Sequence, residues 1–135
     1  MRKLLAFFIL LFVAVCIDVA WFALIANPYY IDSIGHLLRQ TESGFSPDVL
    51  SAVAVYVLLL LGIIWFVLPR ANRQWKKAAR WGAVYGLIVY GIYDFTNYAT
   101  LATWPLNICF FDLAWGVIYC GFLASFAVFL QKKFG

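Results

Sequence analysis

The chain has 135 residues, of which 66% are hydrophobic, 20% aromatic and 12% charged, with a formal net charge of +4. Soluble domains average about 45–50% apolar and about 25% charged residues, so this chain has too little polar surface to face water on all sides. The composition therefore excludes an ordinary water-soluble domain. It predicts a single all-α domain in a lipid bilayer, where four spans of about 20 residues would use most of the length.

The positive charge is concentrated beside apolar stretches. Nine of the ten Lys and Arg residues lie in the segments 2–3, 70–80 and 132–133. This pattern orients a membrane protein and does not form the continuous basic stripe that binds nucleic acid. We expect no nucleic-acid partner.

The first predicted span covers 4–26. It is longer than the apolar core of a secretory signal, about 7–15 residues, and it contains Asp18. The polar segment 27–48 follows, in which apolar residues at helical spacing predict a short helix lying in the membrane interface. At its end, Ser46 is the expected N-cap and Pro47 the first position of the next helix.

Three more spans are predicted in the rest of the chain. The span 49–68 contains no ionisable side chain except Tyr56, and Pro69 is expected to end it. The span 81–101 is the most polar, and the span 106–130 follows a short uncharged turn. We therefore predict a four-helix membrane bundle.

The basic residues also predict the orientation of this bundle. The three basic segments fall on one side of the alternating spans, and only Arg39 falls on the other. By the positive-inside rule, both termini and the connection between the second and third spans are cytoplasmic.

Asp18, Asp94 and Asp112 lie well inside apolar spans that contain no Lys or Arg to pair with them. Each central aspartate opposes membrane insertion by about 2.5–3.5 kcal/mol. A helix rises about 1.5 Å per residue, which places Asp18 and Asp94 roughly 20 Å from the inner ends of their spans and Asp112 roughly 9 Å below the outer end of its span. In a hydrocarbon core about 30 Å thick, the three acids reach one depth in the outer half. This coincidence is the strongest functional signal in the sequence.

Polar and aromatic residues share helix faces with these acids. Gly82-x-x-x-Gly86 also predicts close approach of a neighbouring helix on the face that carries Asp94. Taken singly, the hydroxyl and amide groups have a simpler explanation as hydrogen bonds between helices. The candidate ligand-binding or proton-carrying residues are Asp18, Asp94, Asp112, Asn97, Tyr93, Trp21, Trp115 and Thr100.

Several strings in the chain resemble a bacterial family of predicted inner-membrane proteins, domain of unknown function 2177. They are YDFTNYAT at 93–100, Trp104-Pro105, DLAWG at 112–116, Asp18-x-x-Trp21, NPYY at 27–30 and Gly35-His36. The similarity covers essentially the whole chain, implies a four-helix membrane protein and singles out the same acids. It brings no established activity. It points only towards lipid chemistry, since some relatives look as though they accompany lipid-modifying enzymes.

Three functions are compatible with these residues. The first is an acidic pocket, open to the outer side, that binds or transports a cation or small polar molecule. In it the acids would be charge partners or proton carriers, Asn97 and Tyr93 hydrogen-bond partners, and Trp21 and Trp115 cation–π walls. A transporter of this size would be expected to form a homodimer.

The second function is a membrane enzyme or accessory protein in lipid modification, acting on a lipid headgroup. Paired carboxylates would there do acid–base work or hold a divalent metal. The third is a structural membrane protein with a polar core. The sequence identifies neither a catalytic residue nor a set of metal ligands, and no cofactor is expected.

Overall fold

The computed structural model describes residues 1–134, and these residues are almost entirely helical. The first helical stretch consists of α1 (Arg2–Trp21), a π-helical turn η1 (Phe22–Ala26), α2 (Asn27–Ile34) and a 3-10 turn η2 (Gly35–Leu37). A small antiparallel hairpin of β1 (Gln40–Thr41) and β2 (Gly44–Phe45) follows. The second stretch is α3 (Val49–Gly62), the π-helical turn η3 (Ile63–Val67) and α4 (Leu68–Ala71), before α5 (Trp75–Thr100) and α6 (Leu106–Phe134).

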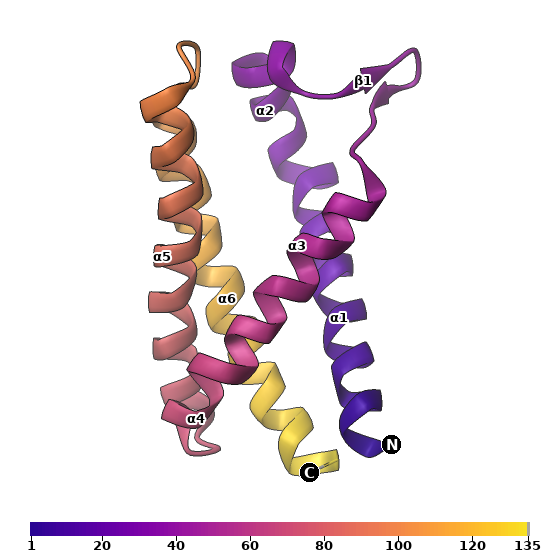
Figure 1. Cartoon of the computed structure of the whole chain (residues 1–135), viewed down its shortest axis with the longest axis vertical. Coiled ribbons are helices and arrows are strands. Elements are labelled where there is room, and N and C mark those ends of the chain that lie inside the picture. The colour runs from indigo at the N-terminus through magenta and orange to yellow at the C-terminus, as the bar shows by residue number, and fades with distance from the viewer. Residues whose placement is uncertain (135) are drawn as a thin grey trace.

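The helices run between two ends of the molecule (Figure 1). Both termini and α4 lie at one end, which we call the basic end because it holds the segments 2–3, 70–80 and 132–133. The β1–β2 hairpin, α2 and the turn between α5 and α6 lie at the other, which we call the hairpin end. The helices α5 and α6 lie side by side in opposite directions, and α1 contacts α6. The second stretch runs obliquely from α1, near the hairpin end, to the foot of α5 at the basic end.

Three helical stretches are long and apolar enough to cross a membrane, namely Arg2–Leu37, Val49–Ala71 and Leu106–Phe134. Large apolar side chains cover much of their outer surface, such as Phe12, Leu24 and Leu50, which are 70%, 82% and 80% exposed. A surface this apolar would aggregate in water, whereas lipid tails solvate it. The chain is thus an all-α protein of membrane type.

The ends of two helices differ from the sequence-based prediction. Asp48, and not Ser46, is the N-cap of α3 and accepts a 2.9 Å hydrogen bond from the backbone N–H of Ser51. Asp48 has the extended backbone conformation of an N-cap residue, with φ −67° and ψ 113°, and the first helical residue is Val49. The helix therefore begins two residues later than expected.

Pro69 does not end the second helical stretch, which continues to Ala71. The π-helical turn η3 precedes α4 and places Pro69 in its first turn. Pro69 has no N–H to donate to the preceding turn, and the helix passes this point through a π-helical turn without ending. The segment 27–48, which follows the first predicted span, contains the expected short helix as α2, which continues α1 through η1. The position of α2 at a membrane interface stays a prediction.

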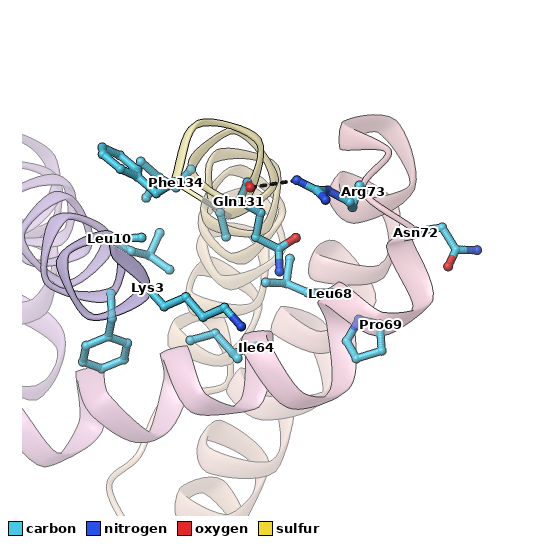
Figure 2. Close-up of a pocket in the computed structure, with 13 residues that line it drawn as sticks. Lys3, Leu10, Ile64, Leu68, Pro69, Asn72, Arg73, Gln131 and Phe134 are labelled. Carbon is cyan, nitrogen blue, oxygen red and sulfur yellow. Dashed lines mark hydrogen bonds between the residues drawn. The ribbon is translucent and has the colours of Figure 1, made fainter. Parts of the chain in front are cut away.

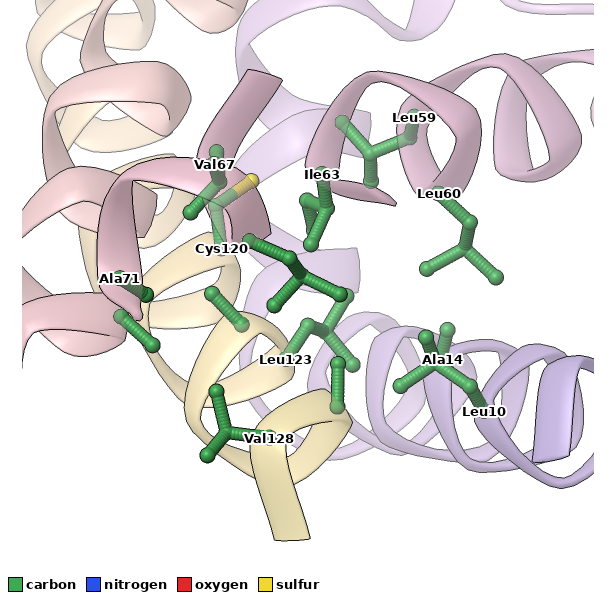
Figure 3. Packing of buried hydrophobic residues seen from close by; sticks show 14 of the residues in the cluster. Leu10, Ala14, Leu59, Leu60, Ile63, Val67, Ala71, Cys120, Leu123 and Val128 are labelled. Atoms are coloured by element: carbon green, nitrogen blue, oxygen red, sulfur yellow. The ribbon is translucent and has the colours of Figure 1, made fainter. Parts of the chain in front are cut away.

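The core lies where α1, α3, η3 and α6 meet (Figure 3). Leu10 and Ala14 of α1 pack with Leu60, Ile63 and Leu123. Since lipid tails are as apolar as these side chains, helix association here depends on close packing more than on exclusion of water. The core occupies the middle and the basic end of the molecule and leaves the aspartates nearer the hairpin end.

Two glycines let α5 and α6 approach each other, as the Gly82-x-x-x-Gly86 spacing predicted. A methyl group added at Gly86 would collide with the carbonyl group of Gly116, and one added at Gly82 would meet the backbone of Cys120. The ring of Tyr90 in turn occupies the space over Gly116. Direct backbone contact fixes the register of this helix pair.

Candidate functional site

The register of α5 and α6 brings two aspartates to one level. Gly86 lies against Gly116 and Cys120, and Tyr90 lies over Gly116. In an antiparallel pair, four residues forward along α5 correspond to four residues back along α6, so the next level holds Asp94 and Asp112. Each is six residues from the end of its helix at the turn, roughly 9 Å by helical rise.

Asp94 is fully buried in α5, and within residues 1–134 neither of its carboxylate oxygens has a hydrogen-bond partner. Its backbone carbonyl accepts a 3.5 Å contact from the Cys109 thiol of α6. Buried side-chain oxygens in proteins nearly always have a partner, so a carboxyl group with none needs an explanation.

Asp112 is 5% exposed, and one of its oxygens is buried without a partner among the described residues. On α6 it lies three residues, about one helical turn, from Trp115, whose indole N–H is bonded to Asp18. Asp112 therefore lies between two parts of the site. It shares a level with Asp94, and the next turn of its helix carries Trp115, the partner of Asp18.

Asp18 is held by its neighbours, in contrast to the other two acids. Its Oδ2 accepts a 2.7 Å hydrogen bond from the Tyr56 hydroxyl of α3, and its Oδ1 accepts a 2.9 Å bond from the Trp115 indole N–H of α6. One carboxylate thus joins α1, α3 and α6. Tyr56 was not among the predicted site residues, although it is the one ionisable side chain in its span.

The two predicted tryptophans stack on each other. The rings of Trp21 and Trp115 are 4.3 Å apart and nearly parallel, at 3°. Tyr119 stacks on Trp115 at 5.2 Å, and Phe111 stacks on Trp21 at 5.4 Å. Each indole therefore covers one face of the other, and this aromatic layer borders Asp18.

Three predicted residues of α5 have varied surroundings. Tyr93 is 56% exposed and meets Trp104 edge to face at 5.9 Å. Asn97 is half-buried, whereas Thr100 is exposed and donates its hydroxyl to the Thr96 carbonyl of its own helix. Thr100 is thus engaged with local backbone, Tyr93 immediately precedes Asp94 on α5, and Asn97 lies about one turn beyond Asp94 towards the hairpin end.

Two pockets in residues 1–134 are lined by residues other than the aspartates. A pocket of about 200 Å³ is lined by Ile17, Ile118, Phe122 and the Trp115–Tyr119 stack. A pocket of about 620 Å³ lies at the basic end. Neither is lined by an aspartate. Within residues 1–134, no group of three or more His, Cys, Asp or Glu side chains is arranged to hold a metal ion. That the three aspartates line one pocket stays a prediction.

Comparison with known proteins is consistent with this membrane architecture. The model of the family described as "Predicted membrane protein (DUF2177)" matches residues 3–129. No curated protein and no solved structure matches the chain. Because the family model covers nearly all of the sequence, the chain belongs to this family of predicted membrane proteins.

Proposed function

We propose that the protein spans the bacterial inner membrane four times, with α5 as a span beside the three apolar helical stretches. The polar residues of α5 and the basic residues in its first two turns keep its mean hydropathy low. Its long contact with α6 nevertheless supports a position within the bundle. The basic end would face the cytoplasm, since it holds nine of the ten Lys and Arg residues.

Within this bundle, the buried carboxyl groups of Asp94 and Asp112 would bind a proton or another cation. The observation that carries this proposal is the complete burial of Asp94 with both oxygens unpartnered in the described chain. A buried unpaired charge is penalised by several kcal/mol. The carboxyl group would therefore carry a proton, or pair with a cation or a small polar molecule that enters from the hairpin end.

Each predicted residue has a role in this proposal. Asp94 and Asp112 exchange a proton for the cation. Tyr93, beside Asp94, and Asn97, one turn closer to the hairpin end, donate or accept hydrogen bonds. Asp18 positions α1, α3 and α6 around them, and the Trp21–Trp115 stack borders the site. Thr100 would lie at its entrance. A transporter would act as a homodimer, because four helices are few for alternating access.

The experiment uses protein reconstituted into vesicles that enclose a pH-sensitive dye. Gradients of sodium, potassium, choline or ethanolamine chloride are imposed in turn. At least one cation should drive protons in the opposite direction, since each positive charge that enters the site releases one proton. Asp94→Asn and Asp112→Asn should remove this response. Asp32→Asn, which changes an exposed acid of α2, should retain it.

The third function considered above, a structural polar core, has one observation of its own. Asp18 is bonded to two other helical stretches, as an interhelical anchor would be. If no cation moves protons, and if only Asp18→Asn lowers the stability while Asp94→Asn and Asp112→Asn behave as wild type, the structural function replaces the proposed one.

A further inference from the structure

A second site is indicated at the basic end, far from the aspartates. A pocket of about 620 Å³ lies there between α1, the second helical stretch and α6 (Figure 2). This volume falls in the range of about 300–1,000 Å³ that is usual for ligand sites. The pocket combines an apolar interior with a cationic mouth, and nothing in the proposed function uses it.

The interior of the pocket is formed by apolar side chains from three elements. Leu10 of α1 lies across from Ile64 and Leu68. Phe7 of α1 and Leu130 of α6 also line the pocket. In a membrane protein, a lateral pocket of this kind meets lipid tails and not water. The interior therefore fits an acyl chain.

The mouth of the pocket carries two cations. Lys3 extends from α1 towards Ile64 and Leu68, and Arg73 reaches from the α4–α5 connection to Gln131, whose carbonyl oxygen accepts a 2.8 Å hydrogen bond from Arg73. That bond uses one of the five N–H groups of the guanidinium and leaves others for a ligand. No acidic residue is among those that line the pocket in the described chain.

The turn that presents Arg73 has an unusual backbone. Asn72 and Arg73 both have positive φ angles, of 47° and 58°. Asparagine adopts this left-handed conformation readily, whereas arginine does so rarely. The conformation turns the chain from α4 into α5 and directs the Arg73 side chain back across α6.

We propose that this pocket binds one anionic phospholipid, with the phosphate between Lys3 and Arg73 and an acyl chain along the apolar wall. The charge of the mouth and the apolar interior are complementary to the two parts of such a lipid. Basic pockets between helices at the cytoplasmic side of membrane proteins are suited to anionic headgroups. The bound lipid would also contact α1, α6 and the α4–α5 connection together at the basic end.

Native mass spectrometry tests the proposal on the full chain in detergent. The protein is incubated with equal amounts of phosphatidylglycerol and phosphatidylcholine that have the same acyl chains. Wild type should retain one phosphatidylglycerol in preference to phosphatidylcholine. Lys3→Gln with Arg73→Gln should reduce this preference by roughly tenfold or more, because two cations near the phosphate are lost.

A matched control separates the pocket from the general charge of this end. Lys132→Gln with Lys133→Gln removes the same charge from exposed residues outside the pocket, and its preference should stay within about twofold of wild type. Arg73→Lys keeps the charge and should keep the preference. Circular dichroism of each variant verifies that the helices are formed.

Three results would overturn the proposal. The first is an unchanged preference in the Lys3→Gln/Arg73→Gln variant. The second is an equal loss in the Lys132→Gln/Lys133→Gln control, which would indicate surface charge alone. The third is displacement of the lipid by excess inorganic phosphate, which would indicate a site for a soluble anion. None of these results depends on whether Asp94 binds a cation.

Discussion

Asp18, Asp94 and Asp112 have the same side chain but different surroundings. Asp18 accepts hydrogen bonds from Tyr56 and Trp115, whereas Asp94 is fully buried with no partner in residues 1–134. A partnered carboxylate stabilises the helices that supply its donors, and an unpartnered one is available to a proton or a ligand. In the proposed function, this difference in surroundings gives Asp18 a positioning role and Asp94 a binding role.

The hydrogen bond from Tyr56 predicts a measurable loss of stability. Tyr56→Phe should lower the free energy of unfolding by about 0.6–1.7 kcal/mol, the range seen for hydrogen bonds between membrane helices. Unfolding by sodium dodecyl sulfate in mixed micelles, followed by circular dichroism, gives this value. Tyr98→Phe is the control, since Tyr98 is 48% exposed on α5, and it should change stability by less than about 0.5 kcal/mol. Equal effects of the two substitutions would contradict the assignment.

The sequence indicated Asp18 and Trp115 but not their partner Tyr56. Ionisable residues stand out in an apolar span because each one opposes insertion. Tyr56 is less conspicuous, and α3 is apolar on all sides, so no periodic pattern indicates which face meets α1. The contact depends on how α3 crosses the bundle, which only tertiary packing determines.

At the scale of the elements, the pairing of α5 with α6 sets the level of Asp94 and Asp112. Gly86→Ala should destabilise the protein by about 1–3 kcal/mol, because the added methyl group meets the Gly116 backbone, which cannot move without separating the helices. Gly91→Ala is the matched control on the same helix, where nothing lies within 4 Å of an added methyl group. It should be neutral or stabilise by up to about 1 kcal/mol through helix propensity. A Gly86→Ala protein as stable as wild type in the same detergent assay would show that the helices are not in direct contact.

The N-terminus of α3 is expected to respond to acid. Hydrogen bonding to Ser51, through its side chain and its backbone N–H, lowers the pKa of Asp48 below its ordinary value in water. A lowered pKa in the folded state means that Asp48 stabilises the helix end above the ordinary pKa, about 3.9, and that this contribution is lost as the pH falls through the lowered value. Hydrogen-exchange protection of the Ser51 amide should therefore decrease in acid.

Two substitutions of Asp48 distinguish its charge from its capping bond. Asp48→Asn keeps a capping oxygen without a titrating group, so protection at Ser51 should no longer depend on pH. Asp48→Ala removes the cap and should lower protection at every pH. A pH dependence that persists in Asp48→Asn would assign it to another group.

The level shared by Asp94 and Asp112 could be predicted from the sequence, since each lies six residues from a short turn.

The helix ends could be predicted less well. Both Ser46 and Asp48 are good N-cap residues, so residue type alone does not decide between them, and the structure places the cap at Asp48. The basic pocket could not be predicted, because Lys3, Arg73 and Leu130 are far apart in the chain and meet only through the fold.

At the scale of the whole molecule, the nine basic residues at one end predict its orientation in the membrane. Cysteines introduced at Gln74, in the α4–α5 connection, and at Ser43, in the hairpin, lie at opposite ends and are both exposed. An impermeant thiol reagent on intact cells should label position 43 and leave position 74 unlabelled until the cells are opened. The parent chain controls for its own Cys16, Cys109 and Cys120. Labelling at 74 but not at 43 would invert the topology and place the aspartates in the inner half.

The central claim is that the buried Asp94 carboxyl group carries an exchangeable proton or cation. Infrared difference spectroscopy of the protein in lipid vesicles measures this directly through the carboxylic C=O stretch. Wild type at pH 7 without added cation should show a protonated carboxyl band that decreases when the cation identified by vesicle flux is added. Asp94→Asn should lose the Asp94 part of that band and keep only what Asp112 contributes. The absence of any protonated carboxyl band at pH 7, or an identical band in wild type and Asp94→Asn, would contradict the account.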